Sequence, residues 1–260
     1  MCTYWSDLWF LKRSAWVFFM LSMLTTAFVA AEQISGARFA KPVDRYGHFA
    51  LGRPHEYAQL VATTDRGQDV VLELPGHEVF EDLSPRMVTL TDHGAIRLLA
   101  IVSSVDQGAR LVLFKLEENQ LAILAQSAPI GTPNRWLNPV GVADLNDDGE
   151  AEVAAVITPH IGGTLKVYRR EGARLVEIDS LPGFSNHVYG SAELELSRAV
   201  LVGGHRQLLV PDVSRKTIRA IRLTRDGLTE TERCFLSVPV TGPEALGDCD
   251  IQLNSSPGSE

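Results

Sequence analysis

The sequence predicts an all-β fold for the chain beyond about residue 46. Short apolar segments rich in branched side chains alternate there with Gly, Asp, Asn and Pro, which is the pattern of strands separated by turns. No segment after residue 32 keeps a helical apolar period over three turns, so no long helix is expected. The clearest predicted strands are 97–102, 109–115, 120–124, 152–157, 164–168 and 173–178.

The N-terminal 31 residues differ from the rest in composition. Lys12 and Arg13 precede an uncharged apolar run, 15–30, which ends in small residues before Glu32. These features are typical of a signal peptide that is removed on export. The run is shorter than the roughly 20 residues of a membrane-spanning helix, although an uncleaved anchor is the alternative. We therefore expect an exported protein, periplasmic or extracellular, with a membrane attachment only if this segment is retained.

Related segments recur along the remaining chain. Residues 89–101 resemble residues 144–156 at an offset of 55, and weaker copies begin at Tyr57 and Arg198. A period of 40 to 55 residues with three or four strands per unit is typical of propeller blades. The sequence therefore predicts a small or partial β-propeller of four or five blades, and a β-sandwich with coincidental spacing is the alternative.

The expected domain organisation follows from these features. Residues 1–31 are the predicted signal peptide and 32–45 a linker. The propeller-like domain is expected over 46–240, followed by a flexible C-terminal tail at 241–260.

One acidic loop carries the strongest chemical signal. Segment 144–152 places oxygen-bearing side chains at its positions 1, 3, 5 and 9, which are Asp144, Asn146, Asp148 and Glu152. Gly149 at position 6 permits a sharp turn, and Glu150 at position 7 offers its backbone carbonyl. Calcium prefers six to eight oxygen ligands in such an arrangement. The sequence therefore predicts one Ca²⁺ site, and a solvated acidic turn held by its own Asn and Asp side chains is the alternative.

This loop differs from an EF-hand, because position 12 is Ala155 and not Glu. It resembles the loop D-x-[DN]-x-D-G-x-x-[DE] of FG-GAP/VCBS repeats in exported bacterial proteins, which are related to the propeller of integrin α chains. The resemblance covers about residues 46–225, with one intact motif, and implies a calcium ion with a structural role. In the preceding copy Arg97 stands where the last carboxylate belongs, so a single site is expected.

Two cysteines remain after the predicted signal peptide. Cys234 and Cys249 form an even pair, which in an oxidising compartment favours a disulfide. Two free thiols in a poorly ordered tail are the alternative. No C-x-x-C motif is present, so redox catalysis is not indicated.

A few other residues are candidates for contacts. Arg135 and Trp136 lie in a connecting segment, where they form either a surface contact or a plug that covers one end of a blade. His160 and His187 fall in predicted loops and could meet on one face of the propeller.

The resulting function is a calcium-stabilised exported binding or scaffold module without intrinsic catalysis. Its ligand is an unidentified protein or saccharide, although few aromatic residues are available to stack on sugars. The formal net charge of −8 and the pI of about 5.4 argue against nucleic acid. The alternative is an enzyme of hydrolase or lyase type on the central face of the propeller, for which no sequence motif is present.

Overall fold

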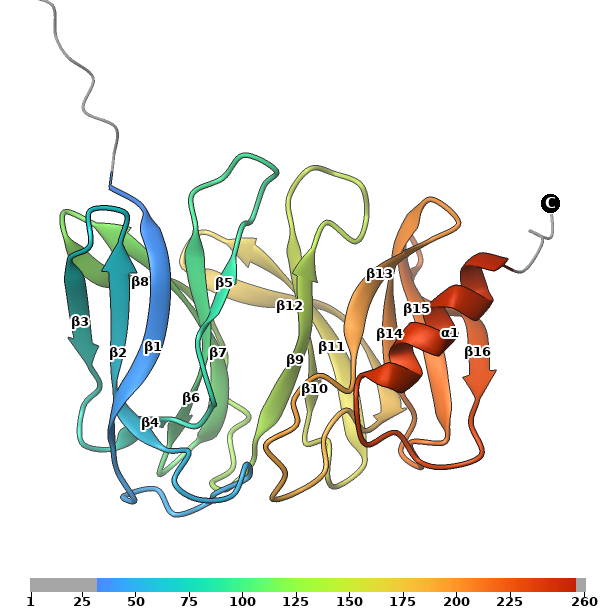
Figure 1. Ribbon diagram of the computed structural model, residues 1–260, viewed down its shortest axis with the longest axis horizontal. Coiled ribbons are helices and arrows are strands. Elements are labelled where there is room, and N and C mark those ends of the chain that lie inside the picture. Colours follow the sequence, from blue (N-terminus) through green and yellow to red (C-terminus); the bar gives the residue numbers. More distant parts are fainter. Residues whose placement is uncertain (1–31, 256–260) are drawn as a thin grey trace, which may run out of the picture. The chain divides into compact units, whose positions relative to one another are not determined.

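The computed structural model describes residues 32–255, which form a mostly β structure with one helix (Figure 1). Residues 1–31 and 256–260 lie outside the described part, and with them the predicted signal peptide. The predicted all-β class is therefore confirmed for the part of the chain that the structure describes.

The strands fall into four antiparallel groups in chain order. The first contains β1 (Ile34–Pro42), β2 (Tyr57–Thr64) and β3 (Asp69–Glu73). The second contains β5 (Arg86–Val88), β6 (Arg97–Ser104), β7 (Gly108–Glu117) and β8 (Gln120–Ser127). The third contains β9 (Leu137–Ala143), β10 (Glu152–Ile157), β11 (Gly163–Glu171) and β12 (Arg174–Phe184). The fourth contains β13 (Arg198–Val202), β14 (His205–Pro211), β15 (Thr217–Thr224) and β16 (Gly227–Phe235).

Narrow links join the first three groups into one sheet of twelve strands, in which β3 and β5 branch off a continuous path. The short strand β4 (Glu78–Phe80) pairs with β6 and, through Phe80 opposite Tyr57, with β2. Strands β8 and β12 pair in parallel over two residues only. The fourth group forms a separate four-stranded sheet. The path is open, and the strands do not close into a ring.

Neighbouring groups bury their facing side chains against each other. In β10, Val153 and Ala155 face a core shared with the second group, whereas Ala154 and Val156 face a core shared with the fourth. Strand β6 divides in the same way between the first and third groups. Because both faces of these strands are covered, they read as continuous apolar runs in the sequence.

The outer surfaces of the first and fourth strand groups differ. The outer face of the first group is polar, with Arg38 paired to Asp69 at 2.9 Å and Lys41 paired to Glu73. At the other end, helix α1 (Glu244–Ser255) covers the fourth group. Within residues 32–255 no helix has the length and apolar character needed to cross a membrane.

Two predicted segment assignments are wrong. Part of the expected linker, 34–42, is strand β1, because Ile34 and Phe39 are buried in the core beside β2. The expected flexible tail contains helix α1, whose Leu246 and Cys249 are buried against the fourth group. The predicted pairing of Cys234 with Cys249 is confirmed as a disulfide, which ties α1 to β16.

The predicted position of the last copy is also shifted by one strand. Residues 198–202 form β13, the first strand of the fourth group, and therefore correspond to β9 and not to β10. The strand in the place of β10 is β14. The loop equivalent to the acidic loop is then the two-residue turn Gly203–Gly204.

Candidate functional site

The acidic loop connects β9 to β10 as a compact turn. Asp144 accepts hydrogen bonds from the backbone N–H groups of Asp148 (3.1 Å) and Gly149 (2.7 Å). The side-chain oxygen of Asn146 also accepts from the N–H of Asp148, at 2.9 Å. Gly149 has φ +91°, in the left-handed region that favours glycine. The predicted ligand residues thus surround one turn, and their oxygens currently accept hydrogen bonds from it.

Glu152 and Arg169 close this turn on the side of the sheet. Glu152 is 1% exposed, and its carboxylate accepts from the N–H of Leu145 at 3.0 Å and from Asn146 Nδ2 at 2.8 Å. Arg169 Nη2 lies 3.3 Å from Glu152 and 3.4 Å from Asp148. Burial raises the pKa of Glu152, while a hydrogen bond from the N–H of Glu150 lowers the pKa of Asp148.

The donor types fit calcium, but the arrangement is that of a turn neutralised by arginine. Among the residues that the structure describes, no group of three or more His, Cys, Asp or Glu side chains is placed to hold a metal ion. A calcium ion would take these oxygens from the backbone N–H groups and would compete with Arg169 for Asp148 and Glu152. The loop therefore contains oxygen ligands of the type that calcium prefers, together with the guanidinium of Arg169, which competes for two of them.

A second set of functional side chains lies at the opposite end of β9, where Trp136 precedes the strand. The Trp136 side chain is 1% exposed, so of the two roles expected for it a surface contact is excluded, and its burial agrees with a plug. Its Nε1 donates to the carbonyl of Glu81 at 2.9 Å. Arg135 beside it remains partly exposed, and its guanidinium donates to the carbonyl of Asn134.

His160 and His187 meet beside this tryptophan. His160 Nε2 lies 2.7 Å from His187 Nδ1, and the His160 ring is parallel to the indole with centroids 6.0 Å apart. His187 Nε2 lies 3.0 Å from the carbonyl oxygen of Ser191. Since a carbonyl only accepts, His187 carries its proton on Nε2, and His160 Nε2 donates to the free Nδ1. Burial lowers the pKa of both histidines to about 4, so the pair is neutral at pH 7.

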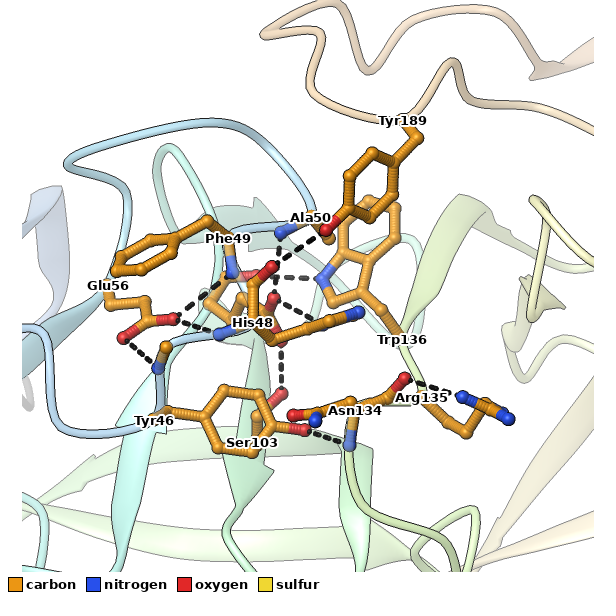
Figure 2. A network of polar contacts seen from close by, with 12 residues as sticks. Tyr46, His48, Phe49, Ala50, Glu56, Ser103, Asn134, Arg135, Trp136 and Tyr189 are labelled. Atoms are coloured by element: carbon orange, nitrogen blue, oxygen red, sulfur yellow. Dashed lines mark hydrogen bonds and ion pairs between the residues drawn. The ribbon is translucent and has the colours of Figure 1, made fainter.

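Tyr189 covers this pair on the solvent side. Its ring contacts His160 edge-on with centroids 5.2 Å apart, and its hydroxyl donates to the carbonyl of His48 at 3.0 Å. Figure 2 shows the contact from the Tyr189 hydroxyl to His48, with Trp136 nearby in the view. Tyr189 itself is 59% exposed. A buried polar network thus holds an exposed aromatic ring in one place.

Glu81 fixes the position of His48. This carboxylate is fully buried and accepts hydrogen bonds from Ser103 Oγ (2.8 Å) and from the N–H of Ala50 (3.1 Å). It also lies 2.8 Å from His48 Nδ1. A buried charge with three partners is well compensated, so the loop after β1 is anchored firmly over β4 and β6.

Glu56 shapes the same loop from within. It is fully buried, and its two oxygens accept from three consecutive backbone N–H groups, those of Gly47 (3.1 Å), His48 (3.0 Å) and Phe49 (3.3 Å) (Figure 2). Nearby, the Tyr46 hydroxyl accepts from the N–H of Asn134 at 2.9 Å, and burial raises the pKa of Tyr46 to about 12. These contacts join the loop after β1 to the segment before β9.

We call the resulting surface the loop edge and define it by residues 43–56, 128–136, 158–162 and 185–196. A hydrogen bond from the Gly190 N–H to the carbonyl of Ala50, at 2.8 Å, joins the loop after β12 to the loop after β1. Its exposed apolar side chains include Ile161 and Tyr189, each 59% exposed. The loop edge and the acidic loop are separated by the seven-residue strand β9, which spans roughly 23 Å.

Sequence reasoning found only part of this arrangement. The meeting of His160 with His187 is confirmed, but His48, Glu56, Glu81 and Tyr189 were missed. Glu81 and Asp82 directly follow the apolar Val79–Phe80, and two acidic residues after a strand are the one signal that was available. No family model matches the sequence, and no curated protein is significantly similar to it. The resemblance to FG-GAP/VCBS repeats therefore depends on the residues of the acidic loop and their spacing.

Proposed function

We propose that this chain is an exported binding module of the partial propeller type, stabilised by calcium and without a catalytic step of its own. The observation that supports it is the loop edge, where a buried polar and aromatic network holds Tyr189 in a fixed position. Preorganised aromatic side chains in fixed surroundings are favourable anchors for a partner, because little side-chain entropy is lost on binding.

The four strand groups are, in this proposal, the blades of an open propeller. Each inner group buries both faces against its neighbours, as blades do. The polar outer face of the first group and helix α1 on the fourth would then serve as caps of a repeat array, which need a soluble or covered outer surface.

Calcium has a structural role in this proposal. Binding at the acidic loop would stabilise the connection between β9 and β10 in the folded chain only, and such binding adds to folding stability. The support is the set of donors on Asp144, Asn146, Asp148 and Glu152 around one turn.

The proposed ligand is a protein. Tyr189 and Ile161 are exposed, and Arg135 lies in the adjoining segment. Tyrosine and arginine are enriched among the residues that dominate protein–protein binding energies. A saccharide would need further aromatic stacking surfaces, and Trp136, which lies in this region, is buried.

Photo-crosslinking in the producing cells tests this proposal. A photoreactive residue is placed at Tyr189 or Ile161, each 59% exposed, and in a control at Val71, which is 54% exposed on the first strand group. We expect a discrete crosslinked protein product from the first two positions and none from Val71. Equal products from all three positions, or none from any, would contradict a binding site at the loop edge.

One observation favours a second candidate, an enzyme of hydrolase or lyase type. The neutral His160–His187 pair offers a base beside an exposed surface. Two other acidic residues of the chain already have local partners: Glu193 accepts from the N–H of Glu195, and Asp212 accepts from Ser214 Oγ. Turnover of generic chromogenic esters or glycosides that is lost in His160→Gln would support this candidate; no turnover by the native protein would remove it.

A further inference from the structure

A small cavity lies between the third strand group and residues 128–130 of the connection that precedes it, at the border of the loop edge. Its volume is about 190 Å³. Its walls are mainly apolar and include Ile130, Leu137, Ile157 and Leu175. An apolar cavity of about 150 Å³ is large enough to bind benzene in a protein interior. The volume and walls therefore suit one six-membered ring with a small substituent.

Tyr168 supplies the polar group of this cavity. The residue lines the cavity and is only 7% exposed, and within residues 32–255 its hydroxyl makes no hydrogen bond. The hydroxyl is not among the fully buried polar atoms that lack a partner, so it is accessible from the cavity, where it can donate to a ligand oxygen. Burial and the nearby charge of Glu177 raise the pKa of Tyr168 strongly, so the hydroxyl keeps its proton and remains a donor.

The charged residues of the cavity already satisfy each other. Lys166 Nζ lies 2.6 Å from Glu177 Oε2, and both residues line the cavity. A charged ligand would have to separate this ion pair or leave its own charge unpaired beside it, whereas a neutral ligand leaves the pair intact.

We propose that this cavity binds a neutral single-ring compound that accepts a hydrogen bond from the Tyr168 hydroxyl. The ring fills the space between Leu137, Ile157 and Leu175, and its oxygen substituent meets the otherwise unpartnered donor. The cavity borders the loop edge through residues 128–130, but its lining does not include Tyr189 or Ile161, on which the proposed function depends.

Phenol and toluene are the probes, because they have the same number of non-hydrogen atoms and differ in the oxygen. The protein, purified as the producing cells make it, is titrated with each probe, and binding is followed by NMR or calorimetry. We expect saturable binding of phenol with a Kd on the order of 1 mM, a value within reach of a ligand of this size. No saturable binding of phenol at about ten times that concentration would overturn the proposal.

Two variants test the assigned contacts. Tyr168→Phe keeps the ring and removes the hydroxyl. It is therefore expected to weaken the affinity for phenol by about 2- to 10-fold and to leave the affinity for toluene unchanged. Tyr57→Phe, a control in the first strand group, leaves both affinities unchanged. Equal weakening of phenol and toluene by Tyr168→Phe would overturn the assigned hydrogen bond.

Ala128→Phe provides an independent check of location. Ala128 is an exposed residue that lines the cavity, so a larger side chain there obstructs it at little cost to the core. We expect this variant to lose both probes. Binding that is unaffected by Ala128→Phe would place the probes elsewhere and overturn the proposal, and neither result depends on crosslinking at Tyr189 and Ile161.

Discussion

The imidazole of His160 donates a hydrogen bond to the imidazole of His187 over 2.7 Å, at the point where the loops after β10 and β12 meet. Both rings adjoin the indole of Trp136. This contact joins two loops that are 27 residues apart in the sequence. This hydrogen bond requires His187 to be neutral, because protonation of His187 Nδ1 would remove the acceptor.

Acid should therefore weaken the fold through this pair. The pKa of each histidine is lowered to about 4 in the folded protein, whereas an unfolded histidine titrates near 6.5. Between these values the unfolded chain binds more protons, so stability falls as the pH drops from about 6.5 to about 4. We expect a loss of up to about 3 kcal/mol for each histidine, measured by urea unfolding at several pH values.

The control separates the pair from other groups that titrate in acid. His160→Gln should reduce the pH dependence between pH 6.5 and pH 4, whereas His93→Gln, a change at an exposed residue, should retain it. The same pH dependence in the native protein and in His160→Gln would exclude this role of the pair.

Calcium should raise the thermal stability of the protein modestly. At a calcium concentration tenfold above the Kd the gain is about 1.4 kcal/mol, or about 3–5 °C in Tm for a chain of this size. The double variant Asp144→Ala, Asp148→Ala should lose this response, measured by calorimetry with and without a chelator. Asp92→Ala, in the equivalent connection between β5 and β6, should keep it.

Arg169 gives this prediction a second test. Because its guanidinium lies within 3.4 Å of Asp148 and Glu152, Arg169→Gln removes a competing cation. We expect this variant to bind calcium more tightly than the native protein. Melting curves that are identical with calcium and with chelator, in both proteins, would indicate a hydrogen-bonded turn without a metal.

Removal of the Glu56 charge should destabilise the protein. The carboxylate accepts from three backbone N–H groups while fully buried, and Glu56→Gln replaces one acceptor oxygen by an amide donor. Hydrogen bonds to a charged group contribute about 1.5–3 kcal/mol, so we expect a loss of about 2 kcal/mol by urea unfolding. Glu118→Gln, at an exposed turn, is the control and should change stability little; equal effects would argue against this anchoring role.

The disulfide should stabilise the fourth strand group through α1. Cys234 and Cys249 are 15 residues apart, and closing a loop of that length contributes about 3 kcal/mol. The double variant Cys234→Ser, Cys249→Ser should lose about this amount and become sensitive to limited proteolysis near residues 240–255. A reducing agent should reproduce the effect in the native protein and have no further effect in the variant. Unchanged proteolysis would show that packing alone holds the helix.

The strands were predictable because their signal is local. Residues 97–102 and 109–115 are short, largely apolar segments rich in branched side chains that end at turn residues, and they form most of β6 and β7. Helix α1 was missed because Leu246, Cys249 and Leu253 give its apolar spacing over only three turns that also contain Gly247 and several acidic residues. Such a weak helix depends on its packing and its disulfide, which are not local properties.

The loop edge was less predictable than the strands for a physical reason. Glu56 and Glu81 act through backbone groups and side chains of distant loops, as in the contact between Glu81 and His48, 33 residues apart. No spacing rule describes such contacts, because the loops are brought together only by the packing of the strand groups. The acidic loop could be found from the sequence because all of its oxygen donors lie within nine consecutive residues.

The unequal ends of the array have a consequence for how the molecule loses structure. The outer face of the first strand group carries solvated ion pairs, whereas the fourth group is covered by a helix that a disulfide holds in place. In an assembly whose strand groups pack mainly against their neighbours, opening starts at the weaker terminus and proceeds inward. Among the strands, amide exchange should therefore be fastest in β1 to β3. Unfolding is then expected to begin in the first strand group.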